Sequence, residues 1–223
     1  MDGDLDKIYV QALEAVQRSD CPVAIASLTR IINTQIPNRQ SNFVDIGGVK
    51  ETIGKAQSLL GHLYYDGECV VRNYEDAYRL MTRSLRVSKS FTTNYALGNM
   101  YLRGLGIPRN FQLARKHLLE SAAYIFDSTI LLSVIYEIGG YGVEKDLVNS
   151  YMWLNTGLSH FQSFGFTSQT KNQLYSRLNS IEKRLSPGEL RMAQEFSQRC
   201  EHAFFKDGIM RYREDAVSVC EQR

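Results

Sequence analysis

The side chains of this chain that could bind a metal ion or act as nucleophiles are those of four histidines and four cysteines. They are His62, His117, His160 and His202, and Cys21, Cys69, Cys200 and Cys220. No two cysteines lie closer than 20 residues, and no CxxC, CxxH or HxxxH spacing occurs. Zinc sites and redox pairs depend on such close spacings, so we expect neither. We predict four reduced, mostly buried thiols, as in a cytosolic protein, with oxidation as the alternative.

Known catalytic motifs are missing from the sequence. It contains no Gly-x-Ser-x-Gly, no His-Glu-x-x-His and no glycine loop of the phosphate-binding kind. The pattern Gly104-Leu105-Gly106 follows a predicted helix instead of a strand, so it cannot present a helix N-terminus to phosphate. We interpret Cys200-Glu201-His202 as part of a helix end, not as a thiolate–imidazolium pair. We therefore expect no catalytic residue, no cofactor and no metal, and a protein that is not an enzyme.

The overall composition is that of one globular chain with a substantial core. The 223 residues include 26 Lys+Arg and 24 Asp+Glu, which gives a formal charge of +2. Such a balance excludes a chain that coats nucleic acid over its whole surface. The longest uncharged run, residues 147–170, is interrupted by polar residues and is not expected to span a membrane. The acidic first seven residues lack the features of a secretory signal, so we expect a cytoplasmic protein.

Positive charge is concentrated in one segment. Residues 77–119 contain eight basic residues and no acidic one. The basic residues are Arg79, Arg83, Arg86, Lys89, Arg103, Arg109, Arg115 and Lys116. The spacing of the first four predicts that they share the outer side of one helix, where they would steer an acidic partner surface toward the chain. Nucleic acid is a weaker alternative because no stacking aromatics alternate with the arginines, and a solvated face without a ligand is another.

A repeat of about 36 residues organises the middle of the chain. Leu60-Gly61, Tyr64, Gly67, Cys69, Val70, Asn73, Tyr74 and Ala77 recur 37 residues later as Leu97-Gly98, Tyr101, Gly104, Gly106, Ile107, Asn110, Phe111 and Ala114. A third copy contains Ser133, Tyr136 and Gly139 and, after one inserted residue, Gly142, Val143, Asp146, Leu147 and Ser150. Self-similarity at such a period is typical of arrays of paired helices.

Each repeat unit reads as a helix, a glycine loop and a second helix. Small residues such as Gly61 and Ala77 would let the two helices approach closely. The glycine after each first helix, Gly67 in the first unit, is predicted to take the left-handed conformation that ends a helix. Asn73 and its equivalents can cap the second helix. Closely packed helix pairs are therefore expected.

This order of residues resembles the Sel1-like repeat, a relative of the tetratricopeptide repeat with a longer loop. The three units cover residues 54–160, and residues 150–155 and 185–194 are similar to segments that finish such arrays in bacterial proteins. The resemblance implies an all-α, right-handed α/α superhelical solenoid. Glu68-Cys69 departs from the usual small-Gly pair of the first loop, and Gly139-Gly140-Tyr141-Gly142 carries one extra residue in the third.

The segments on either side of the repeats are expected to close the array within a single domain of residues 1–223. Residues 1–34 read as a tetratricopeptide-like N-terminal cap with two apolar helical stripes, and residues 35–50 as a long loop. Residues 168–223 read as closing helices. One is predicted from Pro187 to about Phe204, preceded by a capping box, and two more at 168–184 and 209–221.

The first helix of each unit would present one row of residues to the concave face of such an array. The row comprises Ser58, His62 and Tyr65, then Tyr95, Asn99 and Leu102, then Ile130, Val134 and Glu137. Aromatic rings give large contact areas and polar groups fix orientation, so the row would suit a protein partner. The alternative is that Ile130 and Val134 belong to the core.

The resemblance implies the function of an adaptor, a regulator or an immunity protein that masks a toxin. We predict a non-catalytic, cytoplasmic, bacterial type of protein that binds another protein, with no membrane, no nucleic acid and no small-molecule substrate. The alternative is a hydrolase that acts on a cell-wall or β-lactam-like substrate. The resemblance to secreted repeat proteins suggests this alternative. Those proteins look disulfide-bonded within each repeat, and the cysteine positions of this chain do not allow such pairing.

Overall fold

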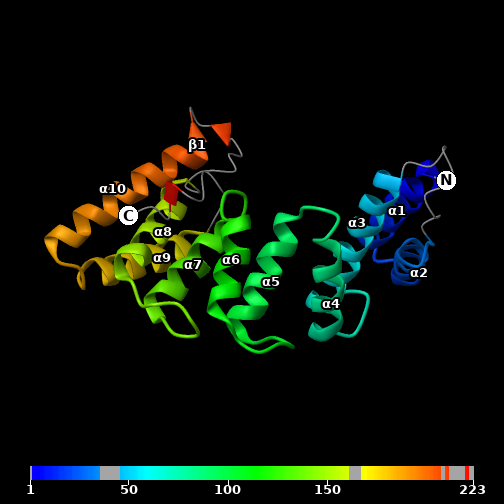
Figure 1. Cartoon of the computed structure of the whole chain (residues 1–223), viewed down its shortest axis with the longest axis horizontal. Helices are drawn as coiled ribbons and strands as arrows, with labels where there is room; N and C mark the ends of the chain where they lie inside the picture. The colour runs from blue at the N-terminus through cyan, green and yellow to red at the C-terminus, as the bar shows by residue number, and fades with distance from the viewer. Residues whose placement is uncertain (1, 36–45, 161–166, 207–208, 211–218, 221–223) are drawn as a thin grey trace. The chain divides into compact units, whose positions relative to one another are not determined.

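The computed structural model describes residues 2–35, 46–160, 167–206, 209–210 and 219–220 (Figure 1). Within these residues the chain is all-α apart from one short strand pair, as predicted. The helices are α1 (Asp2–Gln17), α2 (Cys21–Ile32), α3 (Ile46–Asp66), α4 (Tyr74–Ser84), α5 (Phe91–Arg103), α6 (Phe111–Ser121), α7 (Phe126–Ile138), α8 (Leu147–His160), α9 (Ser168–Glu182) and α10 (Pro187–Phe204). Strands β1 (Phe205–Lys206) and β2 (Ile209–Met210) pair antiparallel. None of the described helices combines the length and the apolar character that crossing a membrane requires.

The chain divides into two compact units. The first contains residues 1–100 and 105–108, and the second contains residues 101–104 and 109–223. Helices α1 to α4 and most of α5 therefore belong to the first unit, and α6 to α10 belong to the second.

The N-terminal cap of the first unit is confirmed. Helices α1, α2 and α3 lie side by side (Figure 1) and share an apolar core. The core includes Leu5, Ala12, Leu28, Ile31, Ile53 and Leu60, all buried. Asp20 caps α2 by accepting a hydrogen bond from the backbone N–H of Val23 at 3.3 Å. A small domain of helices gains most of its stability from such shared apolar faces.

Helix α3 starts earlier than the sequence indicated. The predicted loop at residues 35–50 is wrong for residues 46–50, which are helical from Ile46 onward. Val49 and Ile53 are buried in the core shared with α1 and α2, and this burial outweighs the helix-weakening effect of Gly47 and Gly48. Residues 36–45 of the predicted loop lie outside the described residues.

The paired helices of the repeats pack through small residues, as predicted. A Cβ atom placed on Gly61 of α3 would come within 2.8 Å of Met81 Cγ on α4, and Ala77 of α4 is fully buried. In the second unit, Ser133 of α7 and Ser150 of α8 are fully buried and their hydroxyls lie 3.1 Å apart. Helices α3 and α7 therefore sit almost in backbone contact with α4 and α8, respectively.

The loops between paired helices share one geometry. Gly67, Gly104 and Gly139 all have positive φ, at 72°, 74° and 69°, which confirms the predicted left-handed helix ends. In each repeat a backbone N–H then returns to the first helix. These bonds run from Asn73 to the Tyr64 carbonyl at 3.0 Å, from Asn110 to Tyr101 at 3.0 Å and from Asp146 to Tyr136 at 2.7 Å. The unusual Glu68-Cys69 pair therefore leaves the first loop in the geometry of the others.

The side chains of the same three residues cap the second helices. Asn73 accepts from Glu75 and Asp76 N–H at 3.1 Å, and Asn110 accepts from Leu113 N–H at 2.9 Å. Asp146 accepts from the N–H of Asn149 at 3.0 Å. The predicted caps are confirmed.

The closing helices of the second unit are confirmed except at the C-terminal end. The Ser186 N–H donates to Glu189 Oε2 at 2.8 Å and the Glu189 N–H donates back to Ser186 Oγ at 3.3 Å, a complete capping box. Helix α10 packs on α8. The helix predicted at residues 209–221 is wrong at its start, because Ile209–Met210 forms a strand paired with β1. Residues 211–218 of that prediction lie outside the described residues.

The cysteines form two disulfides, Cys21–Cys69 and Cys200–Cys220. The prediction of four reduced thiols is therefore wrong, and Cys200 is no candidate for a thiolate paired with His202. Cys21 begins α2 and Cys69 follows α3, and these two helices pack together. Packing brings together cysteines that are 48 residues apart, so their spacing in the sequence could not reveal the pair.

Candidate protein-binding surface

Helices α3 and α5 are the first helices of the first and second repeats. They carry the part of the predicted partner-binding row that comes before the third repeat. The Oγ of Ser58 on α3 lies 2.6 Å from the Oγ1 of Thr93 on α5. About two helical turns further along each helix, the side-chain amide of Asn99 donates to the Tyr65 hydroxyl. These hydrogen bonds join successive repeats, so the row is held in place by its own polar groups.

Exposure differs along this row. Ser58, His62, Tyr65 and Tyr95 are partly exposed. Asn99 and Leu102, in contrast, expose only 9% and 8% of their surface. A surface for a partner within the first unit therefore consists of Ser58, His62, Tyr65 and Tyr95. Asn99 supports it from below through its bond to Tyr65.

His62 is held in its neutral form at pH 7. Burial lowers the pKa of its imidazole, and the nearby Asp66 carboxylate counteracts this only in part. Its Nε2 atom is buried and has no hydrogen-bond partner among the described residues. A neutral ring presents an apolar face next to the hydroxyls of Ser58 and Tyr65.

In the third repeat, the chain's own helix α9 contacts the predicted row. Glu137 of α7 accepts hydrogen bonds from Arg177 Nη2 at 2.9 Å and from Arg184 Nη1 at 2.7 Å. Burial by itself raises the pKa of Glu137. The hydrogen bonds and the positive charges of the two arginines lower this pKa by a larger amount, so the net shift is downward. Glu137 is therefore not a free acceptor for a partner.

The two aliphatic residues of the same row are partly buried. Ile130 packs against the core cluster that contains Leu178 of α9 and Leu154 of α8, with Leu174 beside it. The alternative interpretation, that Ile130 contributes to the core, is confirmed by this packing. Val134 is likewise only partly exposed.

The basic residues are arranged less regularly than their spacing indicated. Helix α4 ends at Ser84, so Arg79 and Arg83 lie on the helix and Arg86 follows it. The prediction of four basic residues on one helix is thus wrong for Arg86 and Lys89. Arg79 forms an ion pair with Asp76, whereas Arg83 and Arg86 are exposed and form no ion pair within the described part of the chain.

The basic residues of the second unit have partners of their own. Arg115 Nε donates to the Tyr136 hydroxyl at 2.7 Å, and Arg109 Nε donates to the Arg103 carbonyl at 3.1 Å. These arginines therefore support α7 and the second loop. Lys116 is exposed.

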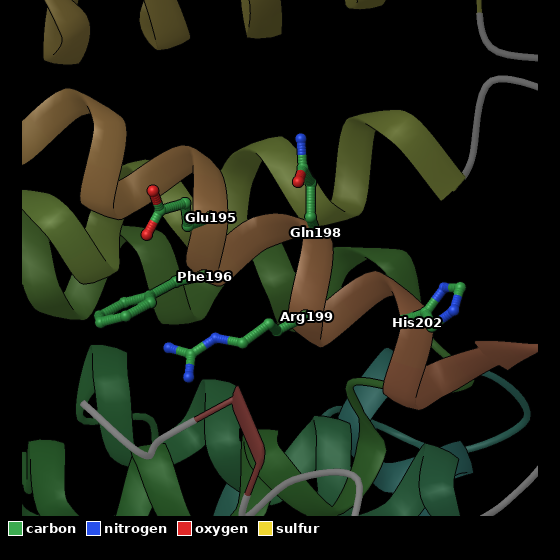
Figure 2. Close-up of a pocket in the computed structure, with 5 residues that line it drawn as sticks. All are labelled: Glu195, Phe196, Gln198, Arg199 and His202. Carbon is green, nitrogen blue, oxygen red and sulfur yellow. The ribbon is translucent and has the colours of Figure 1, made fainter.

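Several grooves among the described residues lie away from the predicted row. One of about 610 Å³ lies beside α10, where the Arg199 guanidinium sits 4.4 Å from the centre of the Phe196 ring (Figure 2). One of about 440 Å³ follows the polar side of α9 at Tyr175. Another, of about 740 Å³, lies beside the first loop of the first unit.

The first-loop groove was not predicted from the sequence. Its lining includes the rings of Tyr64 and Tyr74 and the side chain of Val71, which is 89% exposed. Both tyrosines are positions of the repeat to which we assigned no binding role from the sequence. Their position beside the loop was the signal that a surface could form there.

The structure was also searched for catalytic chemistry. No group of three or more His, Cys, Asp or Glu side chains that could hold a metal ion occurs in the described ranges. His117 stacks on Tyr101 with 5.7 Å between the ring centres. Burial, together with the neighbouring Lys116, lowers the pKa of His117 to about 4. His62 and His117 lie in different compact units.

A known repeat family matches three segments of the chain. The Sel1 repeat matches residues 54–86, 93–123 and 127–157. No curated protein sequence matches the chain.

Two solved structures are similar in fold. A Sel1 repeat protein from Oxalobacter formigenes has 17% sequence identity and a TM-score of 0.50, over 96% of this chain and 80% of that protein. A protective antigen present in uropathogenic Escherichia coli strains, which displays an SLR fold, has 19% identity and a TM-score of 0.42. That match covers 96% of this chain, which spans 50% of the length of the antigen.

The three matched segments coincide with the three repeats identified from the glycine loops and caps. In each unit the first helix, the left-handed glycine and the capped second helix follow in the same order. The chain thus contains three Sel1 repeats and belongs to the Sel1 repeat family.

Proposed function

We propose that this protein is a non-catalytic interaction module that binds another protein through the row of Ser58, His62, Tyr65 and Tyr95. Sel1 repeats are typically protein-interaction scaffolds. The observation that carries the proposal is the pair of hydrogen bonds between α3 and α5, Ser58 to Thr93 and Asn99 to Tyr65. They hold partly exposed aromatic and polar groups in fixed positions before any partner arrives.

A prearranged surface of this kind favours protein recognition. Side chains that are already ordered lose little conformational entropy when a partner binds, so more of the contact energy is available as affinity. Tyr65 and Tyr95 supply the large, rigid contact areas that dominate many interfaces. The uncharged His62 of the same row can be covered without the cost of burying a charge.

The exposed charges of Arg83 and Arg86 favour a partner whose surface is acidic. Both are exposed and neither forms an ion pair among the described residues, so their charge is available to attract a partner. Charges at the rim of an interface act mainly on the association rate, and salt weakens them. An adaptor or regulator and an immunity protein that masks a toxin are both compatible with such a surface.

The two disulfides support a location in an oxidising compartment, such as the bacterial periplasm or the cell exterior. The cytoplasmic location expected from the first residues stays an untested prediction. An adaptor or immunity role would then be exercised where the disulfides are stable. Neither disulfide joins two cysteines of the same repeat, so the argument from cysteine positions against the hydrolase alternative is unchanged.

Copurification tests the proposed function. The tagged chain, kept oxidised at low ionic strength, is expected to retain a stoichiometric protein partner identifiable by mass spectrometry. His62→Ala combined with Tyr95→Ala should weaken that partner's affinity by a factor of about ten or more, because it removes two central contact groups. Tyr175→Ala is the matched control, since Tyr175 is an exposed tyrosine on α9.

Two results would contradict the proposal. One is equal retention of the partner by the double variant and by wild type. The other is the absence of any partner together with an enzymatic turnover that His62→Ala abolishes, which would favour the hydrolase.

Charge reversal separately tests the basic residues. Arg83→Glu with Arg86→Glu should slow association roughly tenfold at low salt and much less at high salt. Arg191→Glu on α10 is the control, because this arginine is also exposed. An unchanged association rate at low salt would show that the two arginines play no part in recognition.

A further inference from the structure

The first Sel1 loop contains a cysteine at a position where the second loop has glycine. Cys69 has a φ of 61°, and Gly106, 37 residues later at the equivalent position, has a φ of 67°. Glycine enters this left-handed region without steric cost, whereas a residue with a Cβ atom does so at a cost. Tyr141 and Ser19 also have positive φ, at 48° and 58°, without a disulfide. Cys69 therefore bears a steric cost that Gly106 avoids, and a restraint on the first loop can offset it.

The disulfide to Cys21 supplies that restraint. Cys21 is the first residue of α2 and so belongs to the N-terminal cap. Cys69 and the following Val70 pack against the core that the cap shares with α3. One covalent bond thus fastens the first loop to the cap.

The residues after Cys69 form one wall of the first-loop groove. Val71 and Arg72 line it together with Tyr64 and Tyr74. Arg72 Nη2 donates to the Asp66 carbonyl at 2.9 Å, and its guanidinium lies 5.9 Å from the centre of the Tyr74 ring. The shape of the groove depends on the backbone conformation of residues 67–73, and the disulfide holds Cys69 within this segment.

The two disulfides differ in their access to a reductant. Cys21 and Cys69 are partly exposed, whereas Cys200 and Cys220 are buried. Thiol–disulfide exchange requires a thiolate to reach one of the sulfur atoms, so exposure governs its rate. The Cys21–Cys69 disulfide should therefore be reduced before Cys200–Cys220.

We propose that the Cys21–Cys69 disulfide is a redox switch that sets the first loop and its groove. A dithiol breaks the Sγ–Sγ bond by supplying two electrons and two protons, which yields two cysteine thiols, and its own two sulfur atoms become a disulfide. Cys69 then leaves the left-handed conformation, and residues 67–73 lose the path that forms the groove. The second and third loops keep glycine at this position and do not respond. The proposal concerns the loop itself and does not depend on the protein-binding function.

Hydrogen exchange of the intact chain tests the switch. The amides of residues 67–73 are compared with those of residues 139–146, in oxidised protein and after mild treatment with dithiothreitol, with mass spectrometry showing which disulfide is reduced. We expect exchange in the first loop to accelerate at least tenfold when only Cys21–Cys69 is open. The third loop, which does not line the groove, serves as the internal control and should change by less than twofold.

Two double variants separate the conformational effect from loss of the bond. Cys21→Ser with Cys69→Ser should exchange in the first loop like the reduced protein. Cys21→Ser with Cys69→Gly places at position 69 the residue that the second loop uses. In this variant the amides of the first loop should exchange roughly tenfold more slowly than in the serine variant, and dithiothreitol should not change their exchange rate.

Several results would overturn the proposal. They are an unchanged first loop in reduced wild-type protein, equal protection in the glycine and serine variants, and equal acceleration in both loops, which would indicate general destabilisation. Should the variants fold poorly by circular dichroism, reduced and alkylated wild-type protein gives the same comparison between the two loops.

Discussion

Arg177 of α9 donates two hydrogen bonds to a single oxygen of Glu137 on α7, from Nη2 at 2.9 Å and from Nε at 3.2 Å to Oε2. The second carboxylate oxygen accepts from Arg184 at 2.7 Å. The Arg177 and Glu137 side chains are about three-quarters buried. The last Sel1 repeat and a closing helix are therefore joined by a partly buried cluster of charges.

Glu137→Gln should destabilise the second unit by about 1–2 kcal/mol, because it leaves two arginines without their carboxylate. The pKa of Glu137 is lower in the folded than in the unfolded state, so this stabilisation is present above about pH 4.3 and is lost as pH falls through the folded-state value. Urea unfolding of wild type and variant at pH 7 and pH 3 should show a difference that shrinks in acid. Glu144→Gln, at an exposed site, should leave stability unchanged.

Gly61→Leu should destabilise the first unit by about 3 kcal/mol or more. The new side chain would meet Met81, which is fully buried, so α3 and α4 would have to separate. Gly61→Ala should cost less, because the gain in helix propensity of about 1 kcal/mol offsets part of the overpacking. Thermal or urea unfolding measures both changes. Gly188→Ala, in the first turn of α10 with open space around it, should not destabilise; an equal loss there would contradict the packing argument.

His117 should make the stability of the second unit depend on pH between about 6.5 and 4. Burial lowers its folded-state pKa to about 4, so the unfolded state takes up a proton first and stability falls as pH decreases through this range. The loss should approach about 2 kcal/mol after allowance for the partial exposure of the ring. His117→Phe keeps a ring against Tyr101 and should flatten this dependence. An NMR titration that gave an ordinary histidine pKa in the folded protein would refute the prediction.

Asn110→Ala should cost about 1 kcal/mol, since the Leu113 N–H at the start of α6 would lose its acceptor. Asn110→Asp should retain most of the stability, because a carboxylate can accept the same hydrogen bond and interacts favourably with a helix N-terminus. Denaturant unfolding measures both variants. Asn172→Ala on the exposed side of α9 is the control, and an equal cost there would argue against a capping role.

Much of the local structure could be predicted because its signals lie within a few residues of one another. Gly67 marks a helix end since only a left-handed residue fits there, and the Ser186–Glu189 pair marks a helix start by mutual hydrogen bonding. The period of the repeat then indicated which helices pair. The spacing of Gly61 and Ala77 indicated the faces through which α3 and α4 meet.

The candidate surface could be predicted only in part. Ser58, His62 and Tyr65 do share one side of α3, as their spacing required. Their bonds to α5, however, depend on how two repeats stack. Nothing in the spacing of Ile130 and Glu137 revealed that α9, about 40 residues later, would contact them.

The order of residues along the chain thus sufficed for the helices, their caps, the left-handed loops and the Sel1 repeat, because hydrogen bonds and steric limits between near neighbours specify each of them. Contacts between distant segments were decided by packing alone. Packing joined Cys21 to Cys69, placed Arg177 on Glu137, extended α3 back to Ile46 and left Tyr95 partly exposed while it buried Asn99. Burial of apolar area depends on the whole arrangement of helices, so no local pattern encodes which distant side chains will meet.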